Sequence, residues 1–69
     1  MYWLKFYEDG VFVTALGQPY YSINDAQMQL VAMADRMRFA DFIVNFPDDK
    51  HFTYDRYGTL CTVKIEEAE

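Results

Sequence analysis

Residues that support catalysis, metal binding or cross-linking are scarce in this chain of 69 residues, which contains one cysteine, one histidine and one serine. A single cysteine excludes an internal disulfide, and a small domain that is stable without one fits a reducing compartment. Cys61 and His51 also fall short of the three or four ligands that a zinc site requires. We therefore predict neither a metal site nor a cofactor, and we interpret Cys61 as a core residue and Ser22 as a helix cap.

Glycine and long apolar segments are also scarce. The three glycines form no phosphate-binding loop, and no apolar run approaches the roughly 20 residues that span a bilayer. The first residues lack the basic region and apolar run of a signal peptide, so we expect a cytoplasmic protein. The eleven acidic residues include no pair with the spacing or apolar setting typical of general acid–base catalysis. The sequence thus favours a noncatalytic protein.

The net charge of −5 and the pI near 4.6 make the chain acidic. Three of the acids, Glu66, Glu67 and Glu69, fall in the last four residues, and without them eight acids face six bases. This balance counts against binding to a phosphate backbone, which requires clustered positive charge.

A chain of this length supports one small core. We therefore predict a single α+β domain over residues 1–65, followed by an acidic C-terminal tail, residues 66–69.

Aromatic residues, in contrast, are abundant: the chain has six Tyr, six Phe and one Trp. Residues 2–7 and 11–16 are rich in aromatic and β-branched residues and flank an Asp-Gly pair at positions 9 and 10, a favoured two-residue hairpin turn. In that register Tyr7 faces Phe12, and cross-strand partners share a face. One face of the predicted hairpin carries Leu4, Phe6, Val13 and Ala15, and the other carries Trp3, Tyr7, Phe12 and Leu16 around Lys5 and Thr14.

A helix is predicted to follow this hairpin. A Gly-Gln-Pro segment at positions 17–19 ends the second strand, and Ser22 is a favourable N-cap with Asp25 three residues on, where a carboxylate stabilises a helix N-terminus. Helical spacing continues to about Phe39. The predicted helix has one apolar stripe, formed by Ile23, Ala26, Leu30, Met33, Ala34 and Met37, with Asp25, Gln29, Asp35 and Arg36 toward the opposite side.

The remaining residues predict three further strands. Residues 42–46 alternate as a strand, and residues 51–54 and 59–65 form a second hairpin around positions 55–58. The order ββαβββ predicts a two-layer α+β sandwich, in which one helix packs on a mainly antiparallel sheet. The alternative is a final hairpin that curls into a half-barrel and hides part of the outer face. The predicted core side of this hairpin comprises Phe52, Tyr54, Cys61, Val63 and Ile65.

One helix covers only one face of a sheet, so the aromatic residues of the other face are left for a partner. The centre of this predicted protein-binding surface is formed by Trp3, Tyr7, Phe12 and Leu16. Acids in the turns would surround it and attract a protein with a basic surface, without direct binding to nucleic acid or membrane. These acids are Glu8, Asp9, Asp48, Asp49 and Asp55. In size and charge the chain is similar to phage-encoded inhibitors such as anti-CRISPR proteins, which implies an inhibitor of a nucleic-acid-handling complex.

Three other uses of the same face stay open. The first is a homodimer interface that buries the aromatic residues against a second copy of the chain. The second is stacking on nucleic-acid bases, for which six scattered basic residues provide the wrong electrostatics. In the third, the outer aromatic residues only stabilise the fold, shielded by the C-terminal tail or by the Tyr20-Tyr21 segment.

Overall fold

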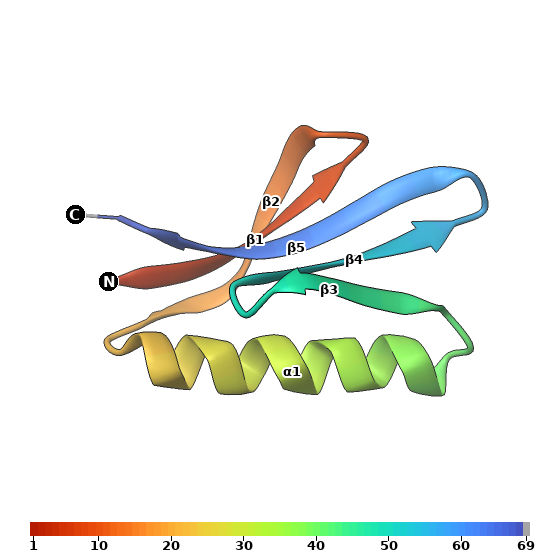
Figure 1. Ribbon diagram of the computed structural model, residues 1–69. Coiled ribbons are helices and arrows are strands. Elements are labelled where there is room, and N and C mark those ends of the chain that lie inside the picture. Colours follow the sequence, from red (N-terminus) through yellow and green to blue (C-terminus); the bar gives the residue numbers. More distant parts are fainter. Residues whose placement is uncertain (69) are drawn as a thin grey trace.

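A computed structural model describes residues 1–68 and contains one helix packed on a five-stranded antiparallel sheet (Figure 1). The strand order is β2-β1-β5-β4-β3, so β1 and β5 lie in the middle and β2 and β3 form the edges. This arrangement confirms the predicted two-layer α+β sandwich. The elements are β1 (Tyr2–Glu8), β2 (Val11–Tyr20), α1 (Ile23–Phe39), β3 (Val44–Asp48), β4 (His51–Arg56) and β5 (Thr59–Glu67).

The helix has well-formed caps at both ends. The Ser22 hydroxyl accepts a hydrogen bond from the Asp25 N–H at 3.1 Å, so α1 begins as predicted. At the other end Asp41 has a φ of 70°, and its N–H donates to the Arg38 carbonyl. The Phe42 N–H then donates to the Met37 carbonyl, which completes a Schellman motif. Because Phe42 belongs to this cap, β3 begins at Val44 and the predicted strand over residues 42–46 is shifted by two residues.

The core lies between α1 and one face of the sheet. In the second hairpin, the predicted core residues Phe52, Tyr54, Cys61 and Val63 are buried, and Ile65 packs against them. The helix contacts all five strands, which explains why a single helix is sufficient to close this face. The fully buried residues are Leu4, Ala26, Leu30, Ala34, Phe52 and Cys61.

The first hairpin departs from the predicted register after one pair. Tyr7 pairs with Phe12 as predicted, but the next pair joins Phe6 to Thr14, so Val13 is an extra residue in β2. This β-bulge shifts the residues from Thr14 to Leu16 by one position, so Val13 and Ala15 do not occupy the helix-side positions predicted for them, and Ala15 pairs with Lys5 on the outer side. Leu16 therefore pairs with Leu4 and lies on the helix side of the sheet, where the sequence predicted it on the outer side.

A second irregularity explains why the predicted end of β2 at positions 17–19 is wrong. Between the Leu4–Leu16 pair and the Tyr2–Tyr20 pair, β2 contains two more residues than β1. Gly17 has a φ of 71°, a conformation that glycine adopts without strain, and the chain then returns to the sheet. β2 thus continues to Tyr20, whose ring packs against the core and does not shield the outer face.

The C-terminal strand is longer than predicted. β5 extends to Glu67, with Glu66 paired to Trp3 and Glu67 paired to Tyr2. The Ala68 N–H donates to the Met1 carbonyl at 2.8 Å, and the start of β1 and the end of β5 lie at the same end of the sheet (Figure 1). Glu66 and Glu67 are therefore residues of the sheet and not of a tail, and Glu69 lies outside the described residues.

Candidate functional site

The sheet face that points away from α1 carries four large apolar side chains, which we call the outer sheet patch: Trp3, Tyr7, Phe12 and Leu60. Alternation along β1 places Trp3 and Tyr7 opposite the core residues Leu4 and Phe6. Trp3 and Tyr7 are half-buried, whereas Phe12 is 51% and Leu60 is 50% exposed. In the described part of the chain no helix or loop covers this face (Figure 1), and the exposed part of the patch is formed mainly by Phe12 and Leu60.

Two lysines lie on the aromatic rings of the patch. Phe12 packs edge-on against Tyr7 with ring centroids 5.6 Å apart. The Lys5 ammonium lies 5.7 Å from the centre of the Phe12 ring, and the Lys64 ammonium lies 4.6 Å from the centre of the Tyr7 ring. Cation–π contacts of this kind hold the lysine chains over the rings. The Tyr7 ring is therefore partly covered by Lys64 and Phe12 on the outer face, and not by residues of the core.

Glu66 joins these lysines to the patch. The Tyr7 hydroxyl donates a hydrogen bond to the Glu66 carboxylate, and both Lys5 and Lys64 lie 3.9 Å from that carboxylate. The hydrogen bond to Glu66 raises the pKa of Tyr7 above its ordinary value. The centre of the outer face is thus a connected group of one tyrosine, two lysines and one glutamate. This role of Glu66 was not predicted, because the acidic composition of residues 66–69 is typical of a tail.

Three of the predicted acids lie at the hairpin end of the sheet. Asp9 accepts a hydrogen bond from the Leu60 N–H at 3.0 Å, and Asp55 accepts one from the Gly58 N–H at 2.8 Å. Glu8 forms an ion pair with Arg56 at 2.7 Å. Among residues 1–68 neither Asp9 nor Asp55, which both lie beside Leu60, forms an ion pair with a lysine or arginine. Glu8, in contrast, is neutralised within the protein.

The other two predicted acids lie at the opposite end, in the turn between β3 and β4. The Lys50 N–H donates to Asp48 at 2.7 Å, and the His51 ring lies 2.9 Å from the same oxygen. The Lys50 N–H, followed by the His51 side chain, lowers the pKa of Asp48 below its ordinary value. Asp49 accepts a hydrogen bond from Gln27 on α1 at 3.3 Å. The structure therefore divides the predicted acidic rim into two groups, and only Asp9 and Asp55 adjoin the exposed end of the patch.

Leu16, the fourth predicted residue of the surface, is not part of it. It lies on the helix side with Phe6 and Met33, as a consequence of the bulge at Val13. Leu60, from the neighbouring strand β5, supplies the exposed aliphatic side chain instead. Leu60 was absent from the predicted site because that site was built from the first hairpin alone, although Leu60 alternates with the predicted core residue Cys61.

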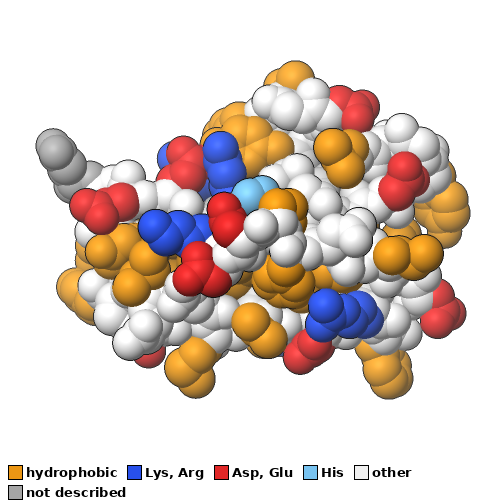
Figure 2. Space-filling model, viewed as in Figure 1, with side chains coloured by type: hydrophobic (Ala, Val, Ile, Leu, Met, Phe, Trp, Pro, Cys, Tyr) orange, Lys and Arg blue, Asp and Glu red, His pale blue; other side chains and the backbone are white. Residues whose placement is uncertain are grey.

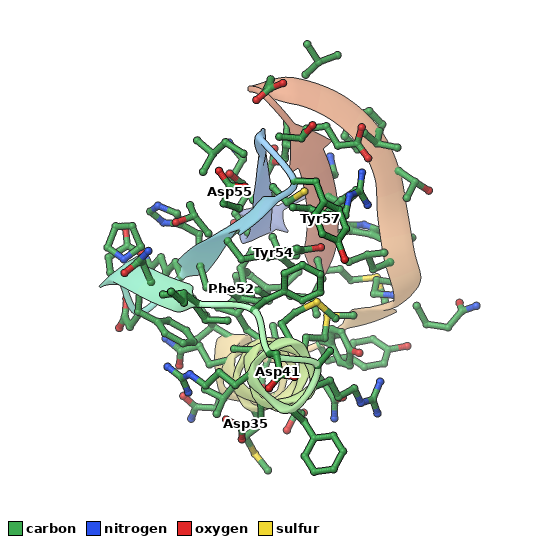
Figure 3. All side chains as sticks on the ribbon, turned by 90° about the vertical axis from the view of Figure 1, so that its right-hand side faces the viewer. Asp35, Asp41, Phe52, Tyr54, Asp55 and Tyr57 are labelled. Carbon is green, nitrogen blue, oxygen red and sulfur yellow. The ribbon has the colours of Figure 1, made fainter. Side chains whose placement is uncertain are left out.

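A second apolar surface, which the sequence analysis did not identify, runs along the side of α1 that faces solvent. Met28, Val31 and Phe39 are 68%, 48% and 93% exposed. Figure 2 shows hydrophobic side chains protruding on the α1 side, and Figure 3 places Asp35 on the same side of the helix, away from the sheet. Asp35 forms an ion pair with Arg38 at 3.3 Å. This second apolar surface could have been predicted from the sequence, since the apolar residues at positions 28, 31 and 39 lie on one face of the predicted helix.

Two further observations concern residues 1–68 as a group. No three His, Cys, Asp or Glu side chains of this segment come together as metal ligands would. The helix α1 lacks the length and the apolar character needed to cross a lipid bilayer.

Comparison with protein-family models, with curated proteins and with solved structures gives no match. Fold and surface together therefore describe an α+β domain with an open aromatic sheet face.

Proposed function

We propose that this protein is a noncatalytic protein-interaction domain that binds its partner through the outer sheet patch. The observation that supports this most is the position of Phe12 and Leu60, half-exposed on a sheet face that no other element covers. Large aromatic residues contribute most of the binding energy in many protein interfaces. Tyr7 pairs with Phe12 and carries Lys64 over its ring, and Trp3 adds a second half-buried ring further along β1 on the same face.

The partner that fits best is a protein with a basic surface. The chain has a net charge of −5, and the acids next to Leu60, Asp9 and Asp55, have no ion-pair partner among residues 1–68. Lys5 and Lys64 do not form a site for a phosphate backbone, because both lie against Glu66. The buried free thiol of Cys61 fits a protein of the cytoplasm. More specifically, we propose that the protein inhibits a nucleic-acid-handling complex. The small size and the acidity of the chain support this proposal.

Site-specific photo-cross-linking tests the proposed surface. A benzophenone amino acid replaces Phe12 in one variant and Phe39 in the other, so that the same residue type is probed on the outer sheet face and on the helix. We expect a protein adduct in native host lysate from the Phe12 variant only. The yield of this adduct should fall when the cross-linking is done at about 1 M salt, because the Debye length there is only about 3 Å and the attraction between charged surfaces is screened. Cross-linking from the Phe39 variant alone, or from neither variant, would contradict the proposal.

A homodimer through the same patch is the second candidate. Lys5, Lys64 and Glu66 lie beside the patch, so a two-fold axis that passes close to Glu66 would place a lysine of one copy near the Glu66 carboxylate of the other. Light scattering of the purified protein distinguishes the two candidates. A dimer mass for the parent protein and a monomer mass for Phe12→Asp would favour self-association. A monomer mass for the parent protein at all concentrations would exclude the homodimer and favour binding to a different protein.

A further inference from the structure

A pocket of about 250 Å³ opens between α1 and β2, on the opposite side of the sheet from the outer sheet patch. Figure 3 shows the two elements that border it, the helix in end view and the curved edge strand β2, with Phe52 and Tyr54 between the sheet and the helix. The side chains that line the pocket are Phe6, Leu16, Met33, Arg36, Met37, Phe52, Tyr54 and Val63.

The walls of this pocket are apolar and adaptable. The bulge at Val13 turns Leu16 inward, where it forms the wall nearest the open edge. Met33 and Met37 line the helix side, and unbranched thioether chains adjust their shape to a ligand at small energetic cost. No acidic side chain lines the pocket. An apolar group placed here would therefore meet no buried charge that opposes it.

Arg36 is the one charged group of the lining, and its guanidinium has no ion-pair partner among residues 1–68. The other two arginines differ from it in this respect, because Arg38 pairs with Asp35 and Arg56 pairs with Glu8. An unpaired guanidinium presents a planar set of N–H donors that matches a carboxylate. Its position at the border of an apolar pocket combines anion binding with burial of a hydrocarbon chain.

We propose that this pocket binds a medium-chain alkyl carboxylate, with the chain between α1 and β2 and the carboxylate on Arg36. A cavity of about 150 Å³ is known to hold benzene, so a pocket of this size accommodates about ten carbon atoms. Octanoate is within this limit. The site is independent of the proposed protein interface, because its lining residues face the helix and not the outer side of the sheet.

Methyl NMR of protein with ¹³C-labelled methionine tests the proposal with octanoate as the probe. Met33 and Met37 line the pocket, whereas Met28 points to solvent on the other side of α1 and serves as an internal control. We expect saturable shifts of the Met33 and Met37 methyl signals, with Met28 unchanged, and weaker binding of octanol. Absence of these shifts at millimolar octanoate, or equal shifts of Met28, would overturn the proposal.

Arg36→Gln tests the role of the guanidinium. Because Arg36 is exposed, its ion pair with the ligand is worth little, and the substitution should weaken octanoate about threefold to fivefold. Octanol affinity should not change, and Arg38→Gln, which changes the same charge outside the pocket, should leave octanoate binding as it is. Equal affinity of octanoate for the parent protein and Arg36→Gln would overturn recognition of the carboxylate.

Discussion

Phe12 and Phe52 are identical side chains on opposite faces of the same sheet, and their replacement by alanine should have very different effects. Phe52 is fully buried, so Phe52→Ala should lower the free energy of unfolding by about 4 kcal/mol. Phe12 is half-exposed and contacts Tyr7 and Lys5, so Phe12→Ala should cost about 1 kcal/mol. Urea denaturation measures both. A loss for Phe12→Ala as large as that for Phe52→Ala would mean that the outer face is closed.

A second prediction at the scale of single residues concerns Asp48 and pH. Its pKa is lowered in the folded protein by the Lys50 N–H and the His51 ring. A carboxyl group with a lowered folded pKa stabilises the protein above its unfolded pKa of about 3.9, and this contribution is lost as pH falls through the folded value. Asp48→Asn should therefore reduce the melting temperature near neutral pH, and the difference from the parent protein should shrink below about pH 4.

Asp49→Asn is the matched control for this measurement. It makes the same change of charge at the next position, but Asp49 accepts no hydrogen bond from Lys50 or His51. A difference between Asp48→Asn and the parent protein that stays constant from neutral pH to pH 2 would show that the Asp48 carboxylate does not act through these bonds.

At the scale of elements, the C-terminal cap of α1 contains a residue that is not optimal for its position. Asp41 has a φ of 70°, and its carboxylate lies at the negative end of the helix dipole. Glycine adopts this conformation without strain and carries no charge. Asp41→Gly should therefore raise the free energy of unfolding by about 1 kcal/mol in urea denaturation.

Asp41→Ala separates the two causes. Alanine removes the negative charge but keeps the Cβ atom that disfavours positive φ. If backbone conformation dominates, Asp41→Ala should be less stable than Asp41→Gly by about 1 kcal/mol. Equal stability of the two variants would assign the effect to the charge alone.

The elements differ in how far the sequence predicts them. Ser22 and the apolar stripe of α1 are local signals, and the helix was predicted with the correct limits. The turn at Asp9-Gly10 was also correct, since Tyr7 pairs with Phe12. The bulge at Val13 was not predictable from the alternation of β2, because the regular register places Val13 and Ala15 on the helix side and the observed register places Thr14 and Leu16 there. The choice depends on whether Leu16 contacts the helix, and this contact exists only in the folded protein.

The outer sheet patch was also predicted only in part, because some of its contacts depend on local signals and others on long-range strand pairing. Trp3, Tyr7 and Phe12 lie within a few residues of the turn, so alternation alone placed them on the outer face. Glu66 reaches this face only because β5 pairs with β1 along its full length, a contact between residues about sixty positions apart. Long-range pairing of this kind carries no local signal, and the acidic composition of the last residues resembles that of a tail.

At the scale of the whole molecule, the last residues of the chain complete the central pair of strands. Deletion of residues 66–69 would remove Glu66 and Glu67 from β5 and the hydrogen bond from Ala68 to Met1. It would also leave the Tyr7 hydroxyl without its acceptor. We expect a loss of about 2 kcal/mol, since a few hydrogen bonds are worth about 1 kcal/mol each. Unchanged stability in urea would show that β5 ends in effect at Ile65.

The central position of β1 and β5 also determines how the protein responds to force. These strands are antiparallel neighbours, and Met1 and Ala68 meet at one end of the pair. Tension applied between the two ends of the chain would load the hydrogen bonds of this pair one after another, as in the opening of a zipper, and never all at once. In an optical trap the domain should therefore yield at low force, beginning with the separation of its two middle strands.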